Sequence, residues 1–405
     1  MSVYARRQFL RFLAASPICS LSYGAAGQSQ SASPAQAAVA SPDLVLNVFE
    51  FEAIARNHIP PAHFGYLATG VDDDRTLRAN HEAFNHLQLR PRRLVDVAHV
   101  DTSVELFGTT WSAPLFLCPC GSQHAFHPEG ELATARAAKT RKTLQILSTT
   151  ATESVEDVVR EAGFPIWQQL YPTTSWQVTE RIVRRAEKAG CPVLVITVDI
   201  PSGRNTETAK RFAATDTRNC ATCHPPSSKN VRGASTRKPA FEGIDMSEVG
   251  IYTPRFTWES VRQVRALTSM KIVLKGLQAA EDATLAVEHG VDGILVSNHG
   301  GRAEETGRAT IECLPEIIDA VRRANSNIPV MLDGGIRRGT DIFKALAYGA
   351  RAVGIGRPYL WGLGAFGQSG VERVLDLLHT EFTLAMQQCG VRSLREITPS
   401  YVGRA

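Results

Sequence analysis

The sequence from Pro114 onward alternates short runs of apolar residues with longer segments that carry an amphipathic helical pattern. Short, continuously apolar strands separated by helices are typical of a parallel sheet that is covered on both faces. Eight such units favour a closed barrel over an open sheet, so we expect an α/β fold of the (β/α)₈ TIM barrel type. The expected strands are Leu115–Pro119, Thr143–Leu147, Ile166–Leu170, Val193–Val198, Lys271–Lys275, Gly293–Ser297, Pro329–Leu332 and Ala352–Ile355.

Two segments lie outside this repeating pattern. The residues before Pro114 form an N-terminal helical cap, with helical patches expected near Val48–Arg56 and Asp73–Asn85. A long inserted loop, residues 203–254, follows the fourth strand and is irregular and basic. A loop of this length in a compact domain is usually functional or disordered. We expect the barrel with both additions to occupy residues 42–405.

Residues 1–41 have the layout of a targeting segment. Arg6 and Arg7 precede an apolar run, Phe12 to Leu21, and a tail of small residues follows. Paired arginines in this context are typical of a twin-arginine export signal. We therefore expect a periplasmic protein, with a flexible tail on a cytoplasmic protein as the alternative. Arg6, Arg7 and Arg11 carry three of the four net positive charges, and the near-neutral remainder gives no reason to expect nucleic acid as a partner.

Polar residues follow five of the expected strands, at the ends where this fold places its chemistry. His299 and Arg302 stand in the run Ser297 to Arg302, after the sixth strand. A histidine of near-neutral pKa can accept a proton from a hydroxyl group or from carbon, and an arginine can hold a carboxylate through two bonds. Lys275 ends the fifth strand, and Asp199 is a candidate to orient His299. A lone histidine is more often structural, but this combination favours catalysis.

Two loops after the last two strands combine glycine with arginine. Gly334, Gly335 and Gly339 let backbone N–H groups approach an anion, and Arg337 or Arg357 can add a charge-assisted contact. Phosphate sites in this fold commonly use these same loops. The alternative is a pair of tight turns with solvated arginines. The presence of both residue types in both loops favours a phosphate site.

These motifs resemble the FMN-dependent 2-hydroxy-acid oxidase and dehydrogenase family, which includes glycolate oxidase, lactate oxidase and mandelate dehydrogenase. The similarity extends from about Val48 to Ile397, and Ser297-Asn298-His299-Gly300-Gly301-Arg302 is its most specific run. The resemblance implies an FMN enzyme that oxidises an L-2-hydroxy acid to the 2-oxo acid. In it, His299 would remove the substrate proton and Lys275 would neutralise negative charge on reduced flavin.

The resemblance also assigns the remaining site residues. Those that would hold the substrate are Tyr66, Tyr171 and Arg302. Those that would hold FMN are Pro119, Cys120, Gly121, Ser148, Gln169, Thr197, Lys275, Ser297, Asp333, Gly335, Arg337, Gly356 and Arg357.

The sequence departs from the family pattern near the expected substrate and flavin. Asn205 stands where the family has a second arginine for the substrate carboxylate, and one residue is missing before it. Either Arg204 takes over this role or Arg302 holds the carboxylate alone. Gly121 and Thr150 replace larger residues beside the flavin, which predicts a bulkier substrate and a dehydrogenase rather than an oxidase. The Ala303-Glu304-Glu305 run is expected to add negative charge near the site.

The run Cys220-Ala221-Thr222-Cys223-His224 has the pattern of c-type haem attachment. A local disulfide or two free thiols are the alternatives, and no other metal site is expected. With the export signal, this pattern makes a cytochrome or a quinone an expected electron acceptor.

Two other functions stay open at this point. One is oxidation of an amine-bearing or peptide-derived substrate on the same barrel, which Asn205 keeps open. The other is a non-catalytic, exported flavin-binding or electron-transfer protein, against which the intact set of candidate catalytic residues argues. Members of the family are often homo-oligomers, and the sequence leaves the oligomeric state undetermined.

Overall fold

Eight parallel strands close into a barrel in the computed structural model, which describes residues 40–218 and 238–404. The strand order around the barrel is β10-β11-β4-β5-β6-β7-β8-β9. The strands are β4 (Leu115–Leu117), β5 (Leu144–Leu147), β6 (Trp167–Leu170), β7 (Val193–Thr197), β8 (Lys271–Leu277), β9 (Gly293–Val296), β10 (Val330–Asp333) and β11 (Val353–Ile355). Each expected apolar run forms one strand, so the prediction of a (β/α)₈ barrel is confirmed.

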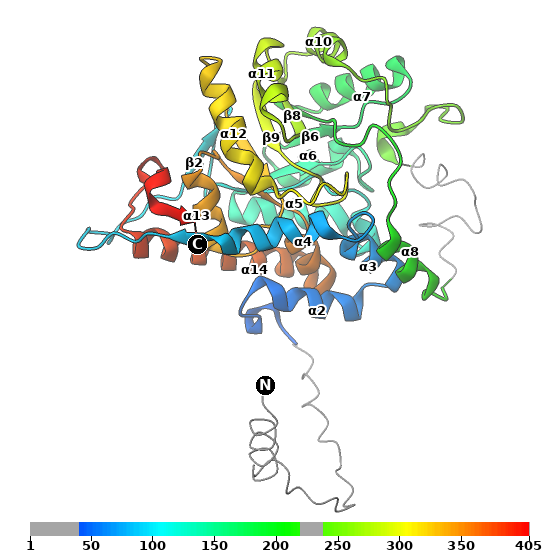
Figure 1. Cartoon of the computed structure of the whole chain (residues 1–405). Helices are drawn as coiled ribbons and strands as arrows, with labels where there is room; N and C mark the ends of the chain where they lie inside the picture. The colour runs from blue at the N-terminus through cyan, green and yellow to red at the C-terminus, as the bar shows by residue number, and fades with distance from the viewer. Residues whose placement is uncertain (1–39, 219–237, 405) are drawn as a thin grey trace, which may run out of the picture. The chain divides into compact units, whose positions relative to one another are not determined.

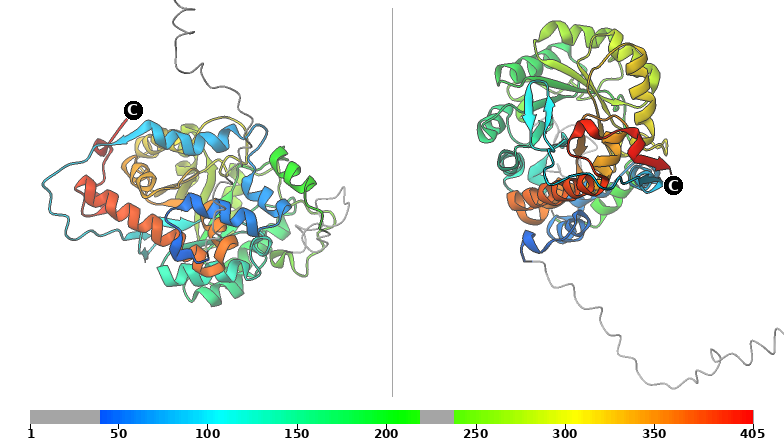
Figure 2. Two further views of the ribbon diagram at one scale, coloured as in Figure 1. Left: turned by 90° about the horizontal axis from the view of Figure 1, so that it is seen from below. Right: turned by 90° about the vertical axis from the view of Figure 1, so that its left-hand side faces the viewer.

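The barrel interior is filled with side chains at the end where the strands begin. A hairpin of β2 (Val104–Leu106) and β3 (Thr109–Trp111) packs its buried residues against inward-facing residues such as Phe116 and Trp167. Figure 2 shows the two cyan strands of this hairpin in front of the ring of helices. With this end packed by apolar side chains, polar groups are left to the other end, where the strands finish.

Helices surround the barrel and cover its strands (Figure 1). They are α5 (Gly130–Arg141), α6 (Val155–Ala162), α7 (Trp176–Lys188), α10 (Trp258–Leu267), α11 (Ala280–Glu288), α12 (Thr310–Arg323), α13 (Gly339–Ala347) and α14 (Arg357–Cys389). The sequence explains their boundaries locally. Ser154 caps α6 by accepting a hydrogen bond from the Asp157 backbone, and Gly163 ends it in a left-handed conformation. No helix in residues 40–218 or 238–404 is long and apolar enough to cross a membrane.

Three helices form the cap expected before Pro114: α2 (Val48–His58), α3 (Pro61–Ala68) and α4 (Arg75–Glu82). The patches expected near Val48 and Asp73 correspond to α2 and α4. Helix α3 was not expected, although Pro61 occupies its first turn, where proline is well tolerated. The cap and the C-terminal segment meet in a short sheet, in which β1 (Leu87–Leu89) pairs antiparallel with β12 (Val402–Arg404).

The prediction that residues 203–254 form one irregular basic loop is wrong for its first part. Residues Glu207–Ala214 form a helix, α8, which lies beside α3 (Figure 1). Its basic side chains also have local partners: Lys210 donates to Asn205, and Arg211 pairs with Glu207. Most of the expected targeting segment, residues 1–39, and the Cys220–His224 pattern lie outside the described residues.

Candidate active site

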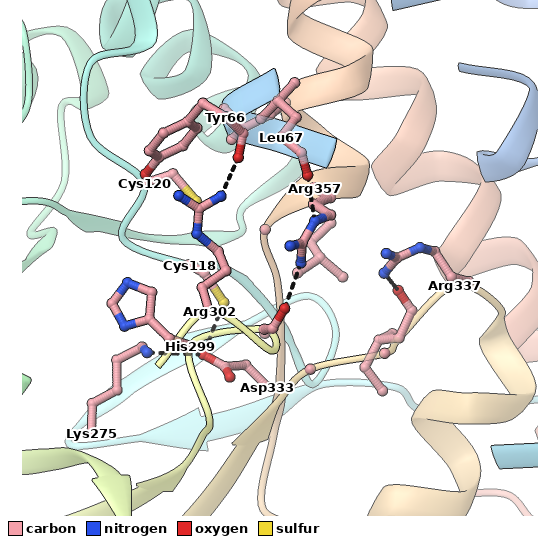
Figure 3. A pocket seen from close by; sticks show the side chains of 18 residues that line it. Tyr66, Leu67, Cys118, Cys120, Lys275, His299, Arg302, Asp333, Arg337 and Arg357 are labelled. Atoms are coloured by element: carbon pink, nitrogen blue, oxygen red, sulfur yellow. Dashed lines mark hydrogen bonds and ion pairs between the residues drawn. The ribbon is translucent and has the colours of Figure 1, made fainter. Parts of the chain in front are cut away.

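A pocket opens where the barrel strands end (Figure 3). Its walls come from the segment after β4, from the ends of β8, β9, β10 and β11, and from helix α3 of the cap. The lining residues are Tyr66, Leu67, Cys118, Cys120, Lys275, His299, Gly300, Arg302, Asp333, Gly334, Gly335, Ile336, Arg337, Gly354, Ile355, Gly356, Arg357 and Leu360.

His299 is held by Asp199 at the cavity. The Nδ1 atom of His299 lies 2.8 Å from Asp199 Oδ1, and its Nε2 atom lies 3.3 Å from the hydroxyl of Tyr171. Because the ionised Asp199 only accepts hydrogen bonds, it fixes the proton on Nδ1 and leaves Nε2 as the basic nitrogen. Burial, followed by the nearby charge of Lys275, lowers the pKa of His299 to about 4, against the opposing effect of Asp199. His299 is therefore neutral at pH 7 and ready to accept a proton.

Lys275 joins two buried carboxylates beneath this histidine. Its Nζ atom lies 3.5 Å from Asp333 Oδ2 and 3.6 Å from Asp199 Oδ2, and it donates to Ser297 Oγ at 2.8 Å. The three charged side chains are only 4%, 7% and 2% exposed. Burial favours the neutral amine, but Asp333 and Asp199 outweigh it and raise the pKa of Lys275 above its usual value. The site thus contains a permanent positive charge.

Two partly buried arginines make no ion pair with any residue that the structure describes, although Glu52 is near enough to act on the pKa values of both. Arg357 donates to the carbonyl oxygens of Leu67, Thr69 and Gly300, and Arg337 donates to its neighbour's carbonyl (Figure 3). Burial lowers the pKa of Arg357 to about 9 and that of Arg337 to about 10. A guanidinium that is largely removed from water and has no ion-pair partner is stabilised when an anion binds beside it. This pair therefore fits a phosphate group, as the glycine and arginine pattern predicted.

Two further arginines meet on the side of His299. Arg302 lies over the ring of Tyr66, 4.0 Å from its centre, and donates to the Tyr66 carbonyl. Arg204 donates through Nη1 to the Arg302 carbonyl at 3.1 Å. Its charge also acts on the pKa values of Tyr171, Asp199 and His299. Two cations beside a neutral base can hold the carboxylate of a small acid.

Comparison with known proteins now decides the family. Residues 55–404 match the family of the FMN-dependent dehydrogenases. Relatives include a peroxisomal (S)-2-hydroxyacid oxidase of Arabidopsis thaliana, 38% identical over 89% of this chain and 97% of that protein. Glycolate oxidase of Spinacia oleracea is 40% identical over 88% of this chain and 95% of that protein.

Solved structures give the same result. A flavocytochrome b2 variant with sulfite bound has a TM-score of 0.80 and 31% identity, over 91% of this chain and 89% of that one. Mandelate oxidase with (S)-2-phenylpropionate has a TM-score of 0.77 and 35% identity, over 89% and 98% of the two chains.

The chain belongs to the FMN-dependent dehydrogenase family. The resemblance seen in the sequence is thereby confirmed, and FMN is the cofactor of this family. The described residues fit FMN on two counts: the two arginines without an ion-pair partner, and Asp333. The Oδ1 atom of Asp333 has no hydrogen-bond partner among these residues and would accept one from a ribityl hydroxyl. Arg337 and Arg357 would hold the phosphate.

The polar residues expected around the flavin ring follow three neighbouring strands. Ser148 donates to Gln169 Oε1 at 3.3 Å, and Gln169 Nε2 donates to Thr197 Oγ1 at 3.0 Å. All three are buried, and they form one hydrogen-bonded chain across the ends of β5, β6 and β7. These three residues do not line the cavity themselves but lie next to residues that do. The same holds for Pro119, Gly121 and Ser297.

Gly121 and Thr150 do not enlarge the pocket, contrary to the prediction. A Cβ atom at position 121 would lie 2.1 Å from Thr150 Oγ1 and 2.9 Å from its carbonyl oxygen. Thr150 therefore occupies the space that Gly121 leaves, and the two residues compensate for one another. Neither residue lines the cavity, so the pair gives no support to a bulkier substrate.

Two other expectations near the cavity also need correction. Gly339 was expected to approach the phosphate, but its N–H donates to Glu381, and its missing side chain makes room for the backbone of α14 at Phe382. Glu305 was expected to add charge at the site, but it accepts from the backbone N–H groups that open α4. Glu304 does lie near the site, because Asp199 contributes to its raised pKa, after the larger effect of burial.

Sequence reasoning missed Tyr252, which lies edge-on to Tyr171 with ring centres 5.0 Å apart. It comes from the second half of the long loop, where no periodic pattern or motif marks it. Cys118 was also missed, although it ends an expected strand. Its thiol contacts Asp333 Oδ2 at 3.6 Å at the cavity wall.

We predict that Arg337→Ala weakens FMN binding by at least tenfold, because a hydrogen bond to a charged group contributes about 1.5–3 kcal/mol. Titration of the apoprotein with FMN, followed by flavin fluorescence, measures the dissociation constant. Arg351→Ala is the matched control, since Arg351 is exposed and lies before β11, at the opposite end of that strand. Equal affinities in the two variants would contradict the phosphate site.

We predict that His299→Asn slows reduction of bound flavin by about 10²–10⁴-fold while FMN stays bound, since this is the usual contribution of a positioned base. Asparagine is the suitable replacement because His299 has a φ of +59°, a left-handed conformation that asparagine tolerates. Anaerobic stopped-flow absorbance measures the rate, with His58→Asn on the exposed side of α2 as the control. A rate within twofold of the wild type would rule out His299 as the base.

Proposed function

We propose that this enzyme oxidises an L-2-hydroxy acid to the 2-oxo acid and passes the electrons to an acceptor other than oxygen. FMN-dependent oxidation of a 2-hydroxy acid is supported by the relatives, which carry this activity in their names. The observation that carries the proposal is the arrangement around His299: a neutral base fixed by Asp199, with Arg302 and Arg204 on the same side.

The described side chains divide the work of this reaction. Arg302 and Arg204 hold the substrate carboxylate and so fix the position of the neighbouring carbon. The hydroxyl of Tyr171 and the ring of Tyr66 border the place of the substrate hydroxyl. His299 Nε2 accepts the hydroxyl proton, and Asp199 stabilises the imidazolium that forms. FMN, when bound, would supply the two-electron acceptor for the Cα hydrogen and its bonding pair, so that the carbon is left as a carbonyl.

Lys275 contributes charge rather than proton transfer. Its raised pKa keeps the amine charged at neutral pH. A fixed cation at the cavity wall favours any negative charge that develops beside it, because the surrounding groups are already oriented. Asp333 and Asp199 hold this cation in place and are held by it in turn.

The alternative of an amine-bearing substrate loses the feature that kept it open. Asn205 does not face the cavity, because its side chain donates to Asp72 and Glu207 on the outer side. Arg204 instead contacts the Arg302 backbone and acts on His299, and so supplies a second cation. A carboxylate therefore remains the group that this site is built to hold.

The proposal that the electrons pass to an acceptor other than oxygen rests on Gly121, because dehydrogenase-like members of the family have glycine at this position. A cytochrome or a quinone is the natural acceptor for an exported enzyme. We expect turnover with glycolate, L-lactate or L-mandelate to be at least tenfold faster with an artificial dye than with oxygen alone. Peroxide production that equals the rate of dye reduction would overturn the dehydrogenase assignment and leave the oxidation of 2-hydroxy acids intact.

Export to the periplasm is a separate proposal, carried by Arg6 and Arg7 ahead of the apolar run. We expect the double variant Arg6→Lys/Arg7→Lys to lose its periplasmic fraction in a bacterial host that has the twin-arginine pathway. Arg11→Lys, which leaves the pair intact, should be exported normally. Immunoblots of periplasmic and cytoplasmic fractions make the measurement. A wild-type protein that stays cytoplasmic would contradict the proposal.

A further inference from the structure

The chain around Arg204 and Asn205 places two neighbouring side chains on opposite sides of the loop after β7. Arg204 donates to the Arg302 carbonyl at 3.1 Å, and its charge acts on the pKa values of His299 and Tyr171. Asn205 donates through Nδ2 to Asp72 Oδ1 at 3.0 Å, and its backbone carbonyl accepts from the Asp72 backbone at 2.9 Å. Asn205 thus contacts the cap, while Arg204 contacts the segment that carries His299 and Arg302.

Three more contacts fasten the same segment to the cap. Thr208 donates to Asp74 Oδ2 at 2.6 Å, and Asp216 accepts from the Ala62 backbone at 3.0 Å. Phe212 packs against Phe64 with ring centres 5.7 Å apart. We call Asn205, Thr208, Phe212 and Asp216 the latch, because they attach α8 to the cap residues 62–74.

The cap residues that face the latch leave space for it and supply its hydrogen-bond acceptors. Gly65 leaves room for α8, since a Cβ atom there would lie 2.6 Å from Phe212 Cβ and 3.3 Å from the Ala209 backbone. Asp72 and Asp74 have φ values of +45° and +59°, a conformation that costs free energy in residues other than glycine. Asp74 holds this turn by accepting from the Gly70 backbone as well. The turn thus presents both carboxylates toward the latch.

The latch also connects two walls of the cavity. Helix α3, to which Phe212 packs, carries Tyr66, and Tyr66 contacts Arg302. The latch segment carries Arg204, which contacts the backbone of the same Arg302. The two cations for the substrate carboxylate are therefore set relative to each other by contacts outside the cavity.

We propose that Asn205, with its partner Asp72, is a positioning residue that turns Arg204 toward the substrate carboxylate, and that the latch holds this arrangement. The proposal rests on the proposed function, because it needs a carboxylate substrate. Loss of the latch should weaken substrate binding more than the chemical step, since Arg204 contacts the substrate equally before and during the reaction.

The test begins with Asn205→Asp, which keeps the shape of the side chain but cannot donate to Asp72. We expect KM for the best substrate among glycolate, L-lactate and L-mandelate to rise three- to tenfold, with kcat within twofold of the wild type. In the double variant Asn205→Asp/Asp72→Asn, the donor and acceptor exchange places, and KM should return toward the wild-type value. Phe212→Ala, which removes the apolar contact, should raise KM by about tenfold.

Arg204→Ala tests whether Asn205 acts on substrate binding through Arg204 or through the stability of the fold. It should raise KM at least as much as Asn205→Asp, and adding Asn205→Asp to it should have little further effect, because both changes remove one interaction. Arg211→Gln, on the exposed side of α8, is the control and should leave KM unchanged. Thermal unfolding of each variant shows whether the fold is retained.

The outcomes are distinct. Additive effects of Arg204→Ala and Asn205→Asp on KM, or a wild-type KM in both Asn205→Asp and Phe212→Ala, would overturn the latch and leave the proposed function standing. A wild-type holoenzyme whose flavin no 2-hydroxy acid of the panel reduces would overturn the proposed function itself.

Discussion

The active site depends on one buried cation placed between two buried carboxylates. Lys275 lies within 3.6 Å of both Asp199 and Asp333, and each of the three side chains is less than one tenth exposed. None of them would be stable alone in this position, because an unpaired buried charge costs several kcal/mol. Together they fix the ends of β7, β8 and β10 relative to one another. Asp199 then orients His299, and Asp333 offers an oxygen to the cofactor, so one network serves both substrate and flavin.

Arg337 and Arg357 differ from Lys275 because neither forms an ion pair with a carboxylate in the described part of the chain. Arg357 and Arg337 are held by backbone carbonyl groups, which orient a guanidinium without neutralising it. Burial lowers their pKa values to about 9 and about 10, yet both remain charged at pH 7. An anion that enters between them gains a full electrostatic contact and displaces no carboxylate. The site is thereby organised for a phosphate, while Arg302 and Arg204 are organised for a carboxylate beside His299.

Much of this could be predicted from the sequence because the barrel repeats one simple rule. The apolar runs predicted the strands. The polar residues at the ends of these runs predicted the site residues His299, Lys275, Asp199 and the two loop arginines. The pairing of Asp199 with His299 across 100 residues follows from the fold, since all strand ends meet at one rim. Contacts between elements without a repeat could not be predicted: the docking of α8 on α3 needs the space that Gly65 leaves for Phe212. The compensation between Gly121 and Thr150 likewise requires coordinates.

His299 acts as a neutral base at physiological pH, because burial and the charge of Lys275 disfavour its protonated form. A base whose pKa is about 4 loses activity only when the pH falls through that value and the imidazole becomes protonated. The most direct measurement is the pH dependence of kcat/KM, taken from anaerobic flavin reduction at low substrate concentration. The account predicts a nearly constant value from pH 7 to pH 5, with a decline only toward about pH 4. A decline with a midpoint at 6.5 or above would contradict it.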